Sequence, residues 1–520
     1  MSFKQQILDF YNLDEATYQA FCLPAKWVDL PLPTTFTDMD KVTARILAAI
    51  TNNEKIVIYG DYDCDGVMAT SILVSALRKL NAQVGYYLPS RYLDGYGLNP
   101  TKVEEFKAKD YSLIITVDNG IAQNEAIDKA NELGIDVVVT DHHQVLDVLP
   151  HAYAILHPSV SGYGDVISCG AYVSFMLASA LLGYYDEYYA TLAMTATISD
   201  MMELTSYNRT ITRLGLEALN KHNYPQFNLL ANTSLYDEKT ISFSIAPKIN
   251  AIGRMLEKIE INQLVTYFTT DDLPTIKRTA YWINKVNDDR KSSMNAAFEN
   301  TEEVNLTDPA LIVFTDEKEG LIGLLAARYL NTYDKPTVVF KEDSKNPDVL
   351  KGSARSRSGF SIAKAFQSMS ELFISYGGHD AAGGCSLLKE NFPLFKEKFN
   401  ALALEYIFDI EEENAIIIKD INEFNFENYN FLAKLKPFGV GFPAPQFKLE
   451  RLPTSIFSWG KAKTHIITSI TKDFKIIGWN LDYELFLSSP YVDLIGELEV
   501  NIFKEVATLQ YSIKSYLNRD

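Results

Sequence analysis

The sequence predicts an α/β protein in which a parallel sheet precedes a second, smaller α/β region and a small all-β domain at the C-terminus. Four short β-branched runs alternate with helical stretches, which is the pattern of a doubly wound parallel sheet. A long amphipathic helix and a second alternation of strands and helices follow it. After the acidic residues 411–413 the chain changes to short strand-like runs around Gly and Pro turns, which favours an all-β domain.

The elements of the first region follow in order along the chain. The expected strands cover 55–60, 83–88, 112–117 and 136–140, with helices at 69–80 and 124–133 between them. Helical patterning then dominates from about 170 to 220. Its most apolar stretch, 172–185, is shorter than the ~20 residues that span a bilayer, so we interpret it as a core helix.

The second half divides at the long helix. We expect this helix at 271–303, because apolar residues recur there at three- and four-residue spacing. Strands at 310–315 and 336–340, a helix at 321–331 and a Gly/Ser/Arg-rich loop with a helix at 352–367 form the second region. The C-terminal strands are expected at 414–418, 464–470, 474–479 and 507–513. The expected domain boundaries are 1–270 for the first α/β domain with an N-terminal extension, 271–303 for the connecting helix, 304–405 for the second α/β domain and 410–520 for the all-β domain.

Composition and charge exclude several classes of protein. The chain has 520 residues, 47% hydrophobic and 22% charged, which is typical of a folded multidomain protein. Its four cysteines form no CxxC pair, so neither a disulfide framework nor a structural zinc site is indicated. The 48 basic and 67 acidic residues give a net charge of −19, which argues against a generic polyanion-binding surface. Without a signal-peptide pattern at the N-terminus, we expect a cytoplasmic protein.

Acidic and imidazole side chains follow three of the predicted strands. Asp63 and Asp65 come just after the first strand, and Asp118 ends the third. The triplet 141–143, Asp-His-His, ends the fourth. Ligands of open α/β sheets bind at the carboxyl ends of the strands, near a topological switch point. We therefore expect these side chains to converge on one site.

A further acid, Asp200, ends a mainly apolar helical stretch. Taken alone, it is equally well explained as an exposed residue of a helix C-terminal turn. With the strand-end residues it completes a set of four carboxylates and one imidazole, namely Asp63, Asp65, Asp118, His142 and Asp200. Such a set suits Mn²⁺ or Mg²⁺ better than a thiolate-bound metal. Two divalent ions bridged by a shared carboxylate are the usual arrangement for in-line attack on phosphorus.

The order of these motifs resembles the DHH phosphoesterase superfamily, and in particular its RecJ branch of single-strand-specific DNA exonucleases. The resemblance runs from about residue 55 to the C-terminus. It is carried by DYDCDG at 61–66, VDNG at 117–120, DHH at 141–143, SDMMEL at 199–204, GAYVSF at 170–175, APKINAIGRM at 246–255, GSARS at 352–356 and GGHDAAGG at 377–384. The segment KPFGVGFPAPQF at 436–447 is similar to the start of the RecJ oligonucleotide-binding barrel, so the all-β domain is expected to be OB-like.

The resemblance implies a role for each matching residue. Two divalent ions, Mn²⁺ or Mg²⁺, would be held by Asp63, Asp65, Asp118, His142 and Asp200. The catalytic set would be Asp65, Asp118, His142 and His143, with His143 facing the scissile phosphate. The terminal 5′ phosphate would be held by Arg91, Ser353 and Arg355. The substrate channel would be lined by Asn250, Arg254 and His379. The sequence departs from the family pattern at Tyr59, Met176, Lys248 and 318–319.

The implied function is a metal-dependent hydrolase that removes nucleotides from the 5′ end of single-stranded DNA, for DNA repair and recombination. Two alternatives remain: a phosphodiesterase of the same superfamily acting on short oligoribonucleotides or cyclic dinucleotides, and an inactive replication scaffold. The expected partner is single-stranded DNA, with a single-strand-binding protein and a helicase as further partners to be considered. We expect a monomer that does not bind membranes.

Overall fold

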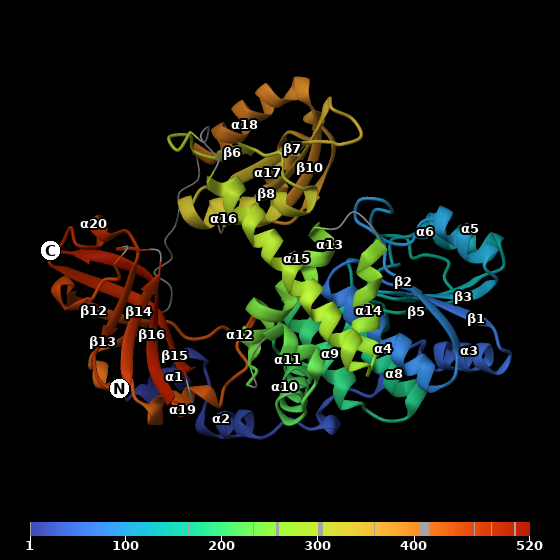
Figure 1. Cartoon of the computed structure of the whole chain (residues 1–520), viewed down its shortest axis with the longest axis horizontal. Coiled ribbons are helices and arrows are strands. Elements are labelled where there is room, and N and C mark those ends of the chain that lie inside the picture. Colours follow the sequence, from blue (N-terminus) through green and yellow to red (C-terminus); the bar gives the residue numbers. More distant parts are fainter. Residues whose placement is uncertain are drawn as a thin grey trace. The chain divides into compact units, whose positions relative to one another are not determined.

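The chain forms two compact units, which Figure 1 traces from blue to red along the sequence. The computed structural model describes residues 2–163, 166–231, 233, 235–255, 259–299, 305–357, 359–404, 415–461, 463–479, 481–503 and 506–520. The larger unit combines 27–202 with 206–409, and the smaller one combines 1–26, 203–205 and 410–520. Across the described ranges, no helix is both long and apolar enough to cross a membrane.

A five-stranded parallel sheet opens the larger unit, in the order β2-β1-β3-β4-β5. Its strands are β1 (Lys55–Tyr59), β2 (Gln83–Tyr87), β3 (Tyr111–Val117), β4 (Asp136–Thr140) and β5 (Ala154–Leu156). The first four confirm the predicted strands, whereas three-residue β5 is too short to leave a periodic signal. The strand order reverses between β1 and β3, so the switch point lies where the DYDCDG and VDNG loops leave the sheet.

Helices cover both faces of this sheet. Helices α5 (Pro100–Ala108) and α6 (Asn124–Glu132) pack together, and their apolar residues share a core with β1, β3 and β4. Helix α4 (Cys64–Lys79) packs against α8 (Gly170–Leu182) and α9 (Glu187–Ser199), which Figure 1 shows on the opposite side of the sheet from α5 and α6. The remaining helices here are α3 (Met39–Thr51), α7 (Pro158–Ser161) and α10 (Ser206–Lys221).

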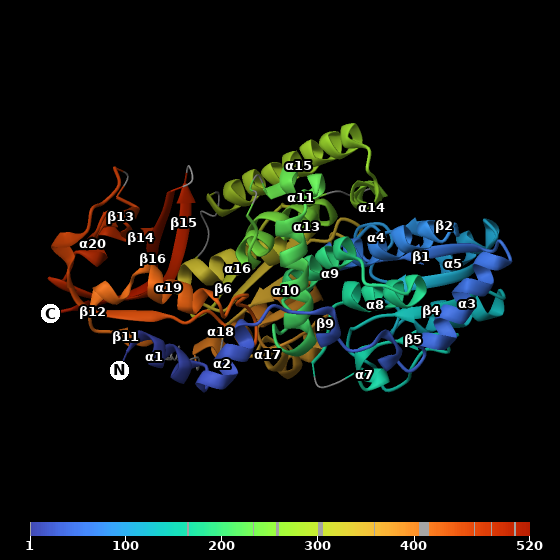
Figure 2. The ribbon, with the colours of Figure 1, turned by 90° about the horizontal axis from the view of Figure 1, so that it is seen from below.

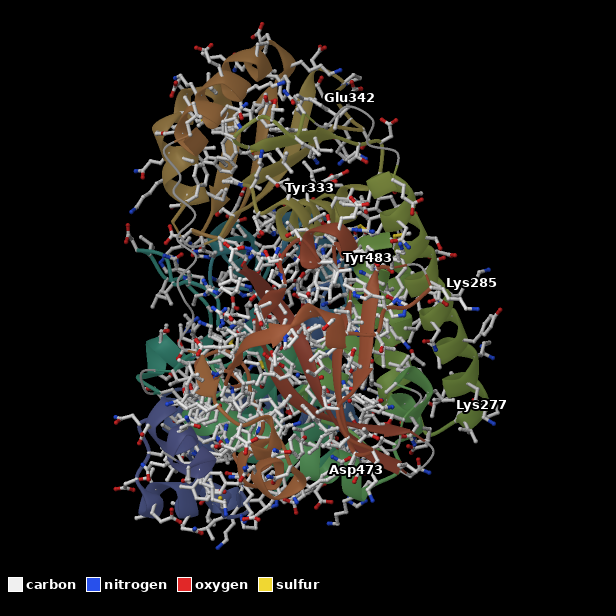
Figure 3. All side chains as sticks on the ribbon, turned by 90° about the vertical axis from the view of Figure 1, so that its left-hand side faces the viewer. Lys277, Lys285, Tyr333, Glu342, Asp473 and Tyr483 are labelled. Atoms are coloured by element: carbon white, nitrogen blue, oxygen red, sulfur yellow. The ribbon has the colours of Figure 1, made fainter. Side chains whose placement is uncertain are left out.

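A helical segment leads from this sheet to the second one. It contains α11 (Pro225–Ala231), α12 (Glu238–Thr240), α13 (Ala246–Met255), α14 (Asn262–Thr269) and the long α15 (Leu273–Glu299). Helix α15 packs along α11, α13 and α14 (Figure 2), and its exposed Lys277 and Lys285 point away from the ribbon (Figure 3). It matches the predicted connecting helix, of which 300–303 lie outside the described residues.

The second sheet is mixed, in the order β6-β7-β8-β10-β9. Its strands are β6 (Leu311–Phe314), β7 (Thr337–Glu342), β8 (Val349–Arg355), β9 (Phe373–Gly378) and β10 (Ala382–Leu388), with helices α16 (Glu319–Tyr333), α17 (Ile362–Ser368) and α18 (Phe392–Leu404). The loop expected at 352–356 was a wrong prediction, because most of it belongs to the central strand β8. Its Gly, Ser and Ala side chains carry little β propensity, and pairing with β7 and β10 holds the segment extended.

The smaller unit contains a six-stranded sheet in the order β11-β12-β15-β16-β14-β13. The strands are β11 (Ile416–Ile418), β12 (Phe447–Pro453), β13 (His465–Ser469), β14 (Phe474–Trp479), β15 (Tyr491–Phe503) and β16 (Val506–Arg519), with helices α19 (Phe426–Ala433) and α20 (Tyr483–Phe486). The N-terminal helices α1 (Phe3–Phe10) and α2 (Glu15–Cys22) belong to the same core, where the Phe3 ring stacks on Phe447 at 5.4 Å. The sequence had assigned these helices to an extension of the first domain.

Candidate active site

The DYDCDG loop places two of the expected ligands at the start of α4. The Asp63 carboxylate caps the helix by accepting the Gly66 N–H at 3.1 Å. Both oxygens of the buried Asp65 accept backbone N–H groups from the first turn of α8, from Gly170 at 2.6 Å and Ala171 at 2.7 Å. The N-terminus of α8 therefore holds Asp65 in one orientation, since its amides favour a carboxylate.

Asp118 and His142 face each other across the switch point. Asp118 follows β3 with a left-handed backbone (φ 60°), and its buried Oδ1 accepts no hydrogen bond from any described residue. The His142 Nε2 lies 3.0 Å from this oxygen. Burial lowers the pKa of His142 to about 3, so its ring is neutral and can act as a ligand. This distance is expected of two ligand atoms that share an ion, because octahedral ligands at ~2.1 Å lie ~3.0 Å apart.

The carboxylates of this site are crowded. Burial, together with the neighbouring acids, raises the pKa of Asp65 to about 6 and that of Asp200 to about 8. The same two causes raise the pKa values of Asp61 and Asp118 well above the ordinary range. Such crowding is costly unless cations neutralise it. The residues present therefore fit divalent metal ions.

Three groups of side chains bring their oxygen or nitrogen atoms within 4.8 Å of one another. They are Asp118 with His142 and His143, Asp65 with His142 and Asp200, and Asp61 with Asp63 and Asp118. All five expected ligands are thus in one cluster. Asp61 was not predicted, although it shares the alternate spacing of the other two acids in its motif. Tyr59 takes no part, because its buried ring points into the α5–α6 core and its Oη donates to the Gly97 carbonyl.

Asp141, which was expected near the site as part of the triplet but was given no role, orients His143. Its Oδ1 lies 2.8 Å from the His143 Nδ1 and accepts the His142 N–H at 2.7 Å, while its Oδ2 accepts the Ile121 N–H at 2.9 Å. Burial alone would lower the pKa of His143, but the hydrogen bond and charge of Asp141 raise it to about 9. The Tyr96 Oη lies 3.1 Å from the other ring nitrogen. His143 is therefore protonated at neutral pH and held at the edge of the cluster.

Four arginines gather beside this cluster, from both α/β regions of the larger unit. Burial and the nearby charges of Arg91, Arg290 and Arg355 lower the pKa of Arg254 to about 10. Within the described ranges, no carboxylate lies within ion-pair distance of any of the four. The Arg91 guanidinium lies 4.4 Å from the centre of the Tyr62 ring, and its buried Nε has no hydrogen-bond partner among the described residues. Half-buried arginines without a carboxylate partner form a site for anions.

Ser353, Asn250 and His379, which were also expected to bind the substrate, lie in three different parts of the fold. Ser353 accepts a hydrogen bond from Arg355 at 3.2 Å on β8. Asn250 uses its Oδ1 to accept the Cys64 N–H at 2.8 Å, so it anchors α13 to the DYDCDG loop. His379 lies exposed in the turn between β9 and β10. Arg290 was not predicted, because a charged residue on a long helix resembles any solvated side chain.

The chain matches three known family domains, and they follow one another in the same order as the three sheets of the structure. Residues 55–202 match the N-terminal domain of the DHH family, residues 308–405 match the DHHA1 domain and residues 418–515 match the RecJ OB domain. The fold class predicted from the sequence is therefore confirmed.

Individual relatives agree with this assignment. The chain is 31% identical over 524 residues to a single-stranded-DNA-specific exonuclease RecJ of Bacillus subtilis, covering 97% of this chain and 66% of that protein. It is 27% identical to the Haemophilus influenzae protein of the same name, covering 92% and 90%. The crystal structure of Thermus thermophilus RecJ with Mn²⁺ superposes with a TM-score of 0.81 at 25% identity, covering 96% of this chain and 74% of that one.

Proposed function

Because the chain belongs to the RecJ family of DHH phosphoesterases, we propose that it is a metal-dependent exonuclease that removes nucleotides from the 5′ end of single-stranded DNA. The observation that carries the proposal is the 3.0 Å approach of the His142 Nε2 to the Asp118 Oδ1, inside a cluster of acids whose charges need a cation. We assign two divalent ions, Mn²⁺ or Mg²⁺, to Asp63, Asp65, Asp118, His142 and Asp200, with Asp61 as an additional ligand. When bound, these ions supply an activated water and neutralise phosphate charge.

The chain's own residues then position the substrate. We assign the protonated His143 to the scissile phosphate, where it would hold a proton close to the developing negative charge. Arg91, Ser353 and Arg355 are assigned to the terminal 5′ phosphate, and Arg254 to the adjoining backbone. A pocket for a terminal phosphate explains exonuclease action, because cleavage then occurs at a fixed distance from the end.

The direct test is a comparison of labelled substrates. Single-stranded DNA, RNA, duplex DNA and dinucleotides are incubated with Mn²⁺, Mg²⁺ or a chelator, and the products are resolved by length. We expect metal-dependent shortening of single-stranded DNA from its 5′ end. Preferential hydrolysis of short oligoribonucleotides or dinucleotides would replace this proposal by the phosphodiesterase alternative, and no hydrolysis with either metal would favour the scaffold.

Arg355→Ala should remove the preference for a 5′-phosphorylated over a 5′-hydroxyl strand. A charge-assisted contact to phosphate contributes ~1.5–3 kcal/mol, so kcat/KM on the phosphorylated strand should fall ~10- to 150-fold. The rate on the hydroxyl strand should change little. The matched control is Arg357→Ala, because Arg357 is two residues away and pairs with Asp334 at 3.1 Å. An unchanged preference in the Arg355 variant would place the terminal phosphate elsewhere.

Trp479 offers an exposed aromatic ring of the smaller unit for base stacking. Phe457 and Phe474 are buried at 7% and 3% exposure and Trp459 packs against Phe486, whereas Trp479 is 62% exposed. The Trp479 ring stacks on His465 at 5.2 Å. We propose that this pair carries bases of the trailing strand, since stacking on aromatic rings is independent of sequence.

Trp479→Ala should raise KM on long single strands ~5- to 150-fold and leave hydrolysis of very short oligonucleotides unchanged, because one stacked base contributes ~1–3 kcal/mol. Tyr281→Ala is the control, since Tyr281 is 74% exposed on α15 between the outward-pointing Lys277 and Lys285. A point substitution is preferable to deletion of 410–520, which would expose the apolar face of α1 that includes Phe3. Equal losses on short and long strands would contradict the stacking role.

Single-stranded DNA is the partner we propose for both units. The resemblance to RecJ also suggests a single-strand-binding protein and a helicase as protein partners, and a monomeric state. Co-sedimentation of the full chain with each partner, with and without single-stranded DNA, would test these interactions.

A further inference from the structure

Helices α13 and α16 meet at a hydrogen-bonded joint that links the two α/β regions of the larger unit (Figure 1). The Tyr92 Oη donates to the Arg254 carbonyl at 2.6 Å and accepts the Gly320 N–H at 3.2 Å. Beside it, the Lys318 Nζ donates to the Met255 carbonyl at 2.6 Å. Gly320 permits this approach, because a Cβ there would lie 2.4 Å from the Arg254 carbonyl oxygen. One phenol therefore ties the last turn of α13 to the first turn of α16.

On one side, the joint is fixed to the metal-ligand loop. The Asn250 side chain of α13 accepts the Cys64 N–H of that loop at 2.8 Å. One turn later, Gly253 packs so closely that a Cβ there would lie 2.4 Å from the Tyr62 carbonyl oxygen. Helix α13 thus has little freedom to move relative to Asp63 and the other ligands of the loop.

On the other side, the joint is fixed to the proposed phosphate pocket. Helix α16 lies over β8 at Gly323, where an added Cβ would be 2.9 Å from the Arg355 Nη2 and 3.1 Å from the Ser353 Oγ. A displacement of α16 therefore displaces the two side chains assigned to the terminal phosphate. The metal cluster and the pocket are connected through two helices and the Tyr92 hydroxyl.

We propose that Tyr92 is a positioning residue that sets the distance between the end pocket and the metal cluster, and so determines which phosphodiester bond from the 5′ end is cut. The inference rests on the proposed exonuclease function. A misplacement of ~1 Å can cost ~100-fold in rate, and a joint that no longer fixes this distance also allows more than one phosphodiester bond to reach the metal cluster. Tyr92→Phe keeps the ring and removes only the hydroxyl that makes both hydrogen bonds.

The test is Tyr92→Phe, examined by single-turnover digestion of a single strand that carries a radiolabelled 5′ phosphate, with the released products resolved at single-nucleotide length. The wild-type protein should release products of one length. The variant should release a mixture of lengths, with kcat reduced ~10-fold and KM within ~2-fold, because the pocket and the cluster each remain intact. The preference for a 5′ phosphate should persist. Gly320→Ala should give the same mixture, since its Cβ pushes α16 away from Arg254.

Tyr87→Phe is the matched control. The Tyr87 Oη donates to Asp94 at 2.8 Å and supports the same loop without touching α16, so this variant should keep a single product length. The proposal is overturned if Tyr92→Phe keeps a single product length, whatever its melting temperature, or if Tyr87→Phe also gives a mixture. It is likewise overturned if the wild-type protein already releases several lengths. Failure of the proposed function is distinguishable, because the wild-type protein would then not shorten the strand at all.

Discussion

Replacing Asp118 with asparagine should reduce cleavage of single-stranded DNA by at least ~1,000-fold and leave strand binding close to the wild-type level. Asparagine keeps the volume of the side chain and tolerates the left-handed backbone at this position (φ 60°). It removes the negative charge that would hold a divalent ion against His142. Loss of one shared ligand disables a two-metal site, whereas the arginines that contact phosphate are unaffected. Rates and filter binding on the same labelled strand measure the two effects separately.

Melting experiments in chelator and with Mn²⁺ show whether the loss of cleavage arises from the loss of metal binding. Burial and neighbouring acids disfavour the charge of Asp118 when no cation is bound, so the variant should be at least as stable as the wild-type protein in chelator. Mn²⁺ at 100 times its Kd should stabilise the wild-type protein by ~2.7 kcal/mol and the variant by much less.

The control for this prediction is Asp110→Asn. Asp110 has the same left-handed backbone (φ 62°), but its side chain is 87% exposed. Asp65 is a poorer choice for substitution, since both of its oxygens accept backbone N–H groups and an amide nitrogen would oppose one of them. An Asp118→Asn variant that folds and retains near wild-type turnover would refute the assignment of the metal site.

The ligand cluster could be predicted because parallel strands impose it. Once β1, β3 and β4 are recognised from their β-branched runs, the residues that follow them must lie at one edge of the sheet. Asp63, Asp118 and His142 therefore come together for a reason that is local in the sequence. Asp200 required the fold, since its position depends on how α9 packs against α4.

Other features depend on contacts that leave no local signal. About half of the residues of β9 and β10 are Gly, Ser or Ala, and the pairing of β10 with β8 and of β9 with β10 holds these segments extended. The N-terminal helices have amphipathic patterns, yet no pattern indicates that Phe3 packs against Phe447. Arg290 joins the arginine group through the packing of α15 and not through its neighbours in the sequence. The role of Asp141 as the partner of His143 also depends on the folded geometry, although the sequence placed the triplet at the site.

The role assigned to His143 depends on Asp141, which leads to a prediction about pH. Burial lowers the pKa of His143, and the carboxylate of Asp141 raises it to about 9. In Asp141→Asn the burial effect should prevail and bring the pKa below its ordinary value of ~6.5. The wild-type protein keeps His143 protonated up to about pH 9, whereas the variant loses this proton near pH 6.

If the protonated His143 serves the scissile phosphate, the alkaline limb of the pH profile of kcat should therefore move to lower pH in Asp141→Asn. At pH 8 a group with a pKa of ~6 is ~1% protonated, so kcat should fall ~10- to 100-fold, with a smaller loss at pH 6. Asp128→Asn is the control, because Asp128 lies 3.1 Å from the exposed His151 in an ion pair of the same chemistry at the surface. A loss in Asp141→Asn that is the same at every pH would mean that the proton on His143 is not used. Asp141 would then only hold the backbone in place, because its oxygens accept the His142 and Ile121 N–H groups.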